Sequence, residues 1–387
     1  PSLYVPHYAT PVAEFGAPVT VGDELFFVNN SDSQGDELWW SDGSPSGTML
    51  IKDTLSGTVS FSGLHVGSLT PFNEQELMFR SSDAEHGAEL WLTDGTITNT
   101  HIISDIEPGT FSSLPYGLIQ VGDYVYFQAR NEAYEGSLWR TDGTEAGTEH
   151  LVDIPGGRYG WFLYPLTYVD GLFFFAAEHP DYGLEYWRSD VTQTGTWLLK
   201  DIAPGTSSSL WYDESNFIGF NGNFYFVAND YGDYGGELWR SDGSQENTVM
   251  LKDINSGSVS SYPMSFGVAN GHLFFSAIDS VHGRELWITD GTEDGTNMVL
   301  DVNPAGDGIN FYNPHSYKVP AYASLNDLFF FTANDGYHGT ELWQSDGTAE
   351  GTVMVMDINP GGDSSQPGTL IVLGNTLYFV ADDGVHG

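Results

Sequence analysis

The sequence contains no cysteine, which excludes disulfide bonds, thiolate metal sites and cysteine catalysis. Positive charge is also scarce, since 11 Lys and Arg stand against 53 Asp and Glu and the formal net charge is −42. Nucleic acids and anionic membranes are bound through clusters of Lys and Arg, so we expect neither as a partner. The longest apolar runs, such as 172–177, are far shorter than the roughly 18 residues of a membrane-spanning helix.

What the chain does contain is glycine and aromatic residues, with 47 Gly, 24 Phe, 21 Tyr and 11 Trp. Runs rich in Ala, Leu, Lys and Glu are missing, so the composition predicts an all-β protein with many turns. The first residues lack a charged region followed by an apolar one, and we therefore expect a mature or excised segment. Strong acidity suits a salty medium that screens self-repulsion, which favours an extracellular or cell-surface location.

One phrase recurs seven times along the chain, for example as AELWLTDGT and RELWITDGT. Copies are 48 to 56 residues apart, and the tryptophan common to all of them is Trp39, Trp91, Trp139, Trp187, Trp239, Trp287 and Trp343. Around each copy we expect four short strands separated by Gly, Asn and Asp turns. Four antiparallel strands repeated at this period predict a β-propeller, whereas a β-helix has much shorter rungs.

We expect a single propeller domain over residues 1–387. Its repeat units are about 15–60, 61–110, 111–157, 158–206, 207–258, 259–308 and 309–363, with a partial unit 364–387 completed by 1–14. Ser2-Leu3-Tyr4 resembles Ser137-Leu138-Trp139, so residues 2–8 are predicted to pair with 377–381 and to close an eight-bladed ring. A seven-bladed ring with unpaired ends is the alternative.

The seven copies resemble the ELWxxDGT repeat family of bacterial, mostly exported proteins, and the resemblance covers nearly the whole chain. It implies a propeller-like fold and surface exposure, and it supplies no catalytic residues. A residue present in every repeat is better explained by structure than by catalysis. We therefore expect the repeated Trp to fill the space between blades, the Glu of the phrase to be a bonded carboxylate, and the Asp to close a turn. In the fourth copy Val191 replaces the turn glycine, which predicts a distorted turn.

Acidic loops precede several copies of the phrase. Asp and His recur three residues apart before a Gly, as in Asp83-Ala84-Glu85-His86-Gly87. Such loops can bind Ca²⁺ through carboxylate oxygens, or Zn²⁺ through His, or they can be ordinary turns begun by Asp. The candidate calcium ligands are Asp83, Glu85, Asp230, Asp233, Asp279, Asp335 and Asp383.

The connections between repeats carry aromatic residues outside the repeated positions. Such rings on one rim, beside carboxylates, are typical of a sugar-binding surface, although they could also fold back onto the rim. We expect a non-enzymatic recognition or scaffold propeller that binds a glycan or surface polymer and belongs to a larger exported protein or assembly. Motifs such as GxSxG and HExxH are missing, which argues against an enzyme. The alternative is a polysaccharide-acting hydrolase or lyase, since a glycosidase needs only two carboxylates. The candidate ligand-binding residues are Tyr159, Trp161, Tyr164, Trp211, Tyr212, Phe311 and Tyr312.

Overall fold

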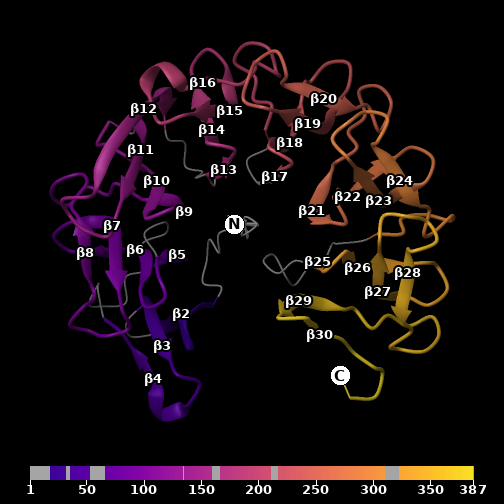
Figure 1. Cartoon of the computed structure of the whole chain (residues 1–387), viewed down its shortest axis with the longest axis horizontal. Helices are drawn as coiled ribbons and strands as arrows, with labels where there is room; N and C mark the ends of the chain where they lie inside the picture. The colour runs from indigo at the N-terminus through magenta and orange to yellow at the C-terminus, as the bar shows by residue number, and fades with distance from the viewer. Residues whose placement is uncertain are drawn as a thin grey trace, which may run out of the picture. The chain divides into compact units, whose positions relative to one another are not determined.

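The computed structural model describes residues 18–31, 35–52, 66–133, 135–158, 166–210, 217–309 and 322–386. The chain divides into two compact units, one formed by 1–201 with 205–207 and the other by 202–204 with 208–387. Over the described residues the regular structure is β-strand apart from two short 3-10 turns, Pro45–Gly47 and Gln193–Gly195 (Figure 1). The all-β prediction is confirmed. No helix among these residues is long and apolar enough to cross a membrane.

The first unit contains four antiparallel sheets, each of four strands taken in chain order. A single backbone pairing, Arg158 with Glu178, joins the third sheet to the fourth. The strands are β1 (Val19–Val21), β2 (Glu24–Ser31), β3 (Gly35–Ser41), β4 (Thr48–Leu50), β5 (Gly67–Pro71), β6 (Leu77–Asp83), β7 (Gly87–Thr93), β8 (His101–Ser104), β9 (Tyr116–Val121), β10 (Tyr124–Arg130), β11 (Glu135–Thr141), β12 (Glu149–Arg158), β13 (Thr167–Val169), β14 (Leu172–His179), β15 (Gly183–Ser189) and β16 (Trp197–Leu198).

The second unit contains three four-stranded antiparallel sheets and a final sheet of two strands. Consecutive four-stranded antiparallel sheets of this kind fit a propeller-like arrangement. The strands are β17 (Phe217–Phe220), β18 (Asn223–Asn229), β19 (Gly236–Ser241), β20 (Val249–Lys252), β21 (Met264–Ala269), β22 (His272–Asp279), β23 (Gly283–Thr289), β24 (Asn297–Leu300), β25 (Tyr322–Leu325), β26 (Leu328–Asn334), β27 (Thr340–Ser345), β28 (Val353–Met356), β29 (Gly368–Leu373) and β30 (Thr376–Val380).

The repeated tryptophan has one structural position. In all seven four-stranded sheets it lies on the third strand opposite a Phe of the second strand, as in Phe79 opposite Trp91 and Phe331 opposite Trp343. Within each unit the ring packs on the core of the preceding sheet. Trp91 belongs to the cluster of Leu38 and Ile51. The prediction that the ring fills the space between neighbouring sheets is therefore confirmed.

The repeated aspartate closes a turn, as predicted. Oδ1 of Asp290 accepts hydrogen bonds from the backbone N–H of Thr292 at 2.9 Å and from its hydroxyl at 2.7 Å. The fourth copy has the same bonds from Thr192 to Asp190, although Val191 stands at φ 62° where the other turns have Gly. The predicted distortion is wrong, because the turn keeps its hydrogen bonds and the backbone of Val191 adopts the strained conformation.

The repeated glutamate holds one sheet to the next through a single residue of the connection that follows. Oε1 of Glu237 accepts the N–H of Ser261 at 3.0 Å, and the carbonyl of Ser261 accepts the N–H of Ile278, in the second strand of the next sheet, at 2.8 Å. We call this arrangement the clamp. It recurs as Glu89–Ser113–Arg130, Glu285–Gly308–Asn334 and Glu341–Ser365–Asp382.

Candidate functional site

The final sheet of the second unit differs from the other sheets because its strand β30 has one open edge. In the preceding sheet the equivalent strand, β26, pairs with β27 from Phe329 opposite Ser345 to Asn334 opposite Thr340. Over the described part of the chain β30 pairs with β29 alone. A row of unpaired backbone N–H and C=O groups is a template for a further strand.

Side chains on β30 are exposed where the equivalent side chains of β26 are buried. Alignment on the loops that end in His338 and His386 makes Phe379 equivalent to Phe331 and Val380 equivalent to Thr332. Phe331 is 0% exposed and Thr332 is 2% exposed, whereas Phe379 is 37% and Val380 is 68% exposed. The sequence therefore provides core residues at positions that no described part of the chain covers.

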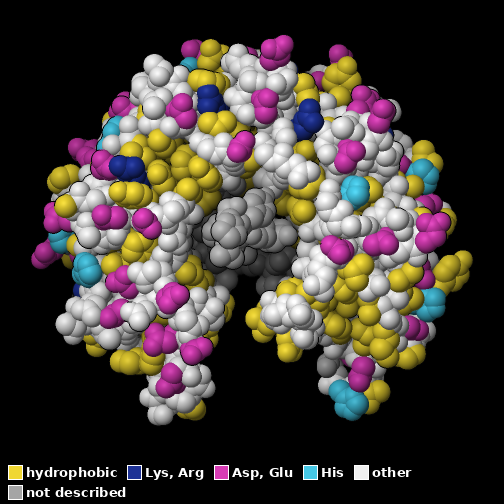
Figure 2. Space-filling view, in the orientation of Figure 1, with side chains coloured by type: hydrophobic (Ala, Val, Ile, Leu, Met, Phe, Trp, Pro, Cys, Tyr) yellow, Lys and Arg dark blue, Asp and Glu magenta, His cyan; other side chains and the backbone are white. Residues whose placement is uncertain are grey.

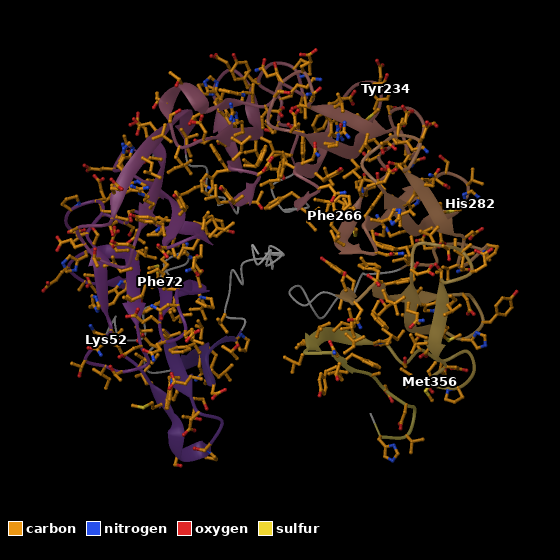
Figure 3. All side chains as sticks on the ribbon, in the orientation of Figure 1. Lys52, Phe72, Tyr234, Phe266, His282 and Met356 are labelled. Atoms are coloured by element: carbon orange, nitrogen blue, oxygen red, sulfur yellow. The ribbon has the colours of Figure 1, made fainter. Side chains whose placement is uncertain are left out.

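Strand β28, the last strand of the preceding sheet, shows the same contrast. Val355 and Leu251 occupy equivalent positions of their sheets, because each comes directly after the residue that pairs with the repeated Trp. Leu251 is buried in one cluster with Trp287 of the following sheet, whereas Val355 is 46% exposed. We define the acceptor surface as Val355, Met356, Tyr378, Phe379 and Val380, all exposed. Figure 2 shows hydrophobic side chains gathered over this end of the second unit, and Figure 3 labels Met356.

The backbone after β30 already has the conformation that leads into a third strand elsewhere. The N–H of Asp382 donates to the carbonyl of Ser365 at 2.9 Å, as the clamp requires. Asp383 accepts the N–H of His386 at 2.7 Å, and the His386 ring nitrogen Nδ1 lies 2.7 Å from its Oδ2. The same loop geometry at Asp335 and His338 leads directly into β27.

The predicted calcium ligands lie in loops whose carboxylates accept local hydrogen bonds. The Asp279 carboxylate accepts the N–H groups of Val281 and His282, and its Oδ2 lies 2.8 Å from Nδ1 of His282. Burial alone would raise the pKa of Asp279, but these hydrogen bonds hold it below its usual value, and the bond to Asp279 raises the pKa of His282. Asp83, Asp335 and Asp383 have the same arrangement. The bonds match the interpretation of these loops as ordinary turns.

The fifth sheet along the chain, β17 to β20, is called sheet five, and its loop differs because Asp230 accepts backbone N–H groups from residues 232 to 235. Glu85 and Asp233 donate their backbone N–H groups to Asp83 and Asp230. Figure 3 shows His282 and Tyr234 at the periphery of the second unit, on separate loops. No group of three or more Asp, Glu and His side chains is placed to hold a metal ion in the described ranges. Calcium binding at these loops stays a prediction.

All seven predicted ligand-binding residues lie outside the described residues, namely Tyr159, Trp161, Tyr164, Trp211, Tyr212, Phe311 and Tyr312. Binding by these residues therefore stays untested by the structure. Sequence reasoning predicted that residues 377–381 pair with residues 2–8, which also lie outside the described residues, but it did not single out Val355 and Met356. The sequence signal for that pairing is the apolar strand 376–380, which keeps the core pattern of a second strand.

No family model matches the sequence, and no curated protein is similar to it. The resemblance to the ELWxxDGT repeat family therefore stays a prediction. Three solved proteins are similar in structure. They are a prolyl endopeptidase (TM-score 0.48, 12% identity, 90% of this chain and 51% of the other covered), a puromycin hydrolase (0.43, 12%, 89% and 54%) and an acylaminoacyl peptidase of Pyrococcus horikoshii (0.40, 10%, 90% and 53%). The chain spans about half the length of the proteins it matches.

The comparisons correct the predicted function. The similar structures are peptidases and a hydrolase, and none of the three is a glycan-binding scaffold. The prediction of a glycan-binding recognition or scaffold propeller is wrong, and neither it nor its polysaccharide-acting alternative is carried forward. Identities of 10 to 12% transfer no activity to this chain, so the function has to be inferred from its own residues.

Proposed function

We propose that this chain is a strand-docking propeller module. Its C-terminal sheet takes up an extended segment along the open edge of β30, and residues 2–8 are that segment, so that the final sheet becomes the eighth blade. The observation that carries this proposal is the exposure of Phe379 and Val380 at positions where Phe331 and Thr332 are buried. Docking is then an instance of β-strand addition, in which backbone hydrogen bonds provide affinity and alternate side chains provide specificity.

The energetic gain from docking resides in the acceptor surface. Fully burying a Val or Phe side chain is worth about 1.5 to 3 kcal/mol. Phe379 and Val380 are partly covered already, so each gains a fraction of that value, and Val355, Met356 and Tyr378 add to the sum. The backbone of β30 gains ladder hydrogen bonds as well. Together these terms outweigh the conformational entropy lost by the segment 2–8 only if most of the surface is covered.

The repeat fixes the register in which the segment should dock. Thr332 lies opposite Leu342 and Phe331 lies opposite Trp343. With Ser2-Leu3-Tyr4 in the place of the Glu-Leu-Trp phrase, Leu3 lies opposite Val380 and Tyr4 opposite Phe379. A shift of one residue would turn every side chain to the other face of the sheet.

A pair of engineered cysteines tests the proposal, because the natural chain has no thiol that could interfere. Leu3→Cys with Val380→Cys should form an intramolecular disulfide under mild oxidation, since directly opposed residues are within disulfide reach. The matched control is Leu3→Cys with Ala381→Cys, whose side chains point to opposite faces. Equal cross-linking in both variants, or none in either, would contradict docking in this register. A disulfide that links two molecules would instead identify a second copy as the occupant.

We also propose an extracellular or cell-surface location. The support is the net charge of −42, which keeps a protein soluble and which salt outside the cell screens. Labelling of intact source cells with a membrane-impermeant reagent should modify the protein, and labelling only after lysis would contradict the location.

A further inference from the structure

The clamp in sheet five is built around a carboxyl group with no exposure to solvent. Glu237 is 0% exposed. Its Oε1 accepts the N–H of Ser261 at 3.0 Å, while its Oε2 accepts the N–H of Ile254 at 3.2 Å and lies 2.5 Å from the Ser261 hydroxyl. The Ser261 hydroxyl also lies 3.5 Å from the carbonyl oxygen of Gly236.

This geometry satisfies the carboxyl in both of its protonation states. The ionised form accepts the two N–H groups and the serine hydroxyl. The neutral form still accepts both N–H groups, donates its own O–H from Oε2 to Oγ of Ser261, and leaves the serine hydroxyl hydrogen to turn toward the Gly236 carbonyl. Proton uptake therefore reverses the direction of one hydrogen bond and breaks none of the bonds between the sheets.

Burial and a nearby negative charge both favour the neutral form of Glu237. Burial raises the pKa of Glu237 to about 7, hydrogen bonds from Ser261 and Ile254 act against that rise, and the nearby Asp253 adds to it. Asp253 acts on this carboxyl through its negative charge, and the loop 230–235 of the same sheet contains no His. Burial likewise raises the pKa of Glu89 to about 8, with Asp105 adding to the rise.

We propose that the clamp is a proton-linked lock at Glu237 and at Glu89, where the glutamate faces a serine hydroxyl and takes up a proton when the sheets pack together. The folded protein then holds protons that the unfolded chain releases at the same pH. The consequence is a module whose sheets are held more firmly in neutral and mildly acidic solution than in alkaline solution.

The sign of the pH dependence follows from linkage. Glu237 has a pKa of about 7 when folded against an ordinary value of 4.5. Its stabilisation is fully present below about 4.5 and is lost as the pH rises through about 7. For one such carboxyl the unfolding equilibrium constant should increase about tenfold from pH 6 to pH 9. His86, His282 and His338 also have raised pKa values and lose stabilisation in the same direction, so variants of the glutamate are needed to separate the two contributions.

Infrared difference spectroscopy of the whole protein measures the proton directly. At pH 6 the spectrum of the wild type minus that of Glu237→Gln should show the carbonyl band of a protonated carboxylic acid, and the band should disappear by pH 9. Urea titrations should give an unfolding constant that rises about tenfold less over this range in Glu237→Gln than in the wild type.

Ser261→Ala gives a second measurement, because it removes the hydroxyl whose hydrogen bond lowers the pKa of Glu237 and keeps the backbone N–H. It should move the disappearance of the band to higher pH, while Ser256→Ala, at an exposed position of the same connection, should leave it in place. If Glu237→Gln does not fold, the shift in Ser261→Ala decides. A wild type without a protonated carboxyl at pH 6, or a band that neither serine variant moves, would overturn the proposal.

Discussion

Two substitutions at the same repeat position measure whether a strand covers β30 in solution. Thr332 and Val380 occupy equivalent positions, but Thr332 is 2% exposed and Val380 is 68% exposed. Thr332→Asp places a charge at a buried position of β26, so it should reduce the free energy of unfolding by about 3 kcal/mol or more. This variant is the reference for a fully covered position.

Val380→Asp then reports on docking. If residues 2–8 lie along β30, the new carboxylate faces Leu3 and should cost about 2 to 4 kcal/mol. If the edge is open, the substitution is a surface change and should cost no more than about 0.5 kcal/mol. The same substitution in a chain that lacks residues 1–17 should fall to this lower value, because the truncation removes the partner strand.

Urea unfolding monitored by tryptophan fluorescence and by circular dichroism gives these free energies, provided that the two signals coincide. A cost below about 0.5 kcal/mol for Val380→Asp in the full chain would refute docking, whatever the truncated chain shows. A cost of several kcal/mol that persists after truncation would show that something other than residues 2–8 covers the edge.

Three further predictions concern the repeats. Trp287→Ala should reduce the free energy of unfolding by about 3 to 5 kcal/mol because the ring fills the core of the preceding sheet, whereas Val281→Ala, at a side chain 81% exposed, should cost less than about 0.5 kcal/mol. Val191→Gly should stabilise the protein by up to about 1 kcal/mol, since it relieves a β-branched residue at φ 62°, and the reverse change Gly347→Val should destabilise it by at least as much; a loss of stability in Val191→Gly would contradict the strain argument. Calcium should raise the melting temperature over that in chelator at matched ionic strength, because the loops place carboxylates such as Asp230 and Asp233 close together in a strongly acidic chain; equal melting temperatures would remove the case for calcium.

The sequence predicted the features that depend on one repeat alone. Alternation along the third strand and the Asp-Gly-Thr turn are local patterns, so the positions of Trp287 and Asp290 could be predicted from their neighbours in sequence. The bonded state of Glu237 was also predicted, but its partner was not. Ser261 lies 24 residues further along the chain, in a connection whose path depends on how two sheets pack. From sequence alone, Ser260-Ser261 cannot be distinguished from the serines of an ordinary polar loop.

The error at Val191 has a different origin. A β-branched residue is strained at positive φ, so a valine costs conformational free energy at this position of the turn. The prediction assumed that the turn would change its backbone conformation to avoid this strain. The turn is held by the Asp190 carboxylate and by the pairing of the Ser189 and Thr196 hydroxyls at 2.7 Å. Val191 also packs against the cluster that contains Leu138 and Trp187, which compensates for part of the strain. Tertiary contacts decided the conformation there.

The clamp also bears on how a chain of this kind can grow during evolution. Its central residue gives its N–H to one sheet and its C=O to the next, so a repeat that has the glutamate supplies one clamp and can receive the carbonyl of another. The third copy has Ser137 in place of the glutamate. A tandem duplication of one whole period that contains the glutamate therefore regenerates the clamp, wherever in the period its breakpoints fall. The number of sheets can change by whole units without the invention of a new contact, whereas loss of a fraction of a period leaves one carboxylate buried without its donors.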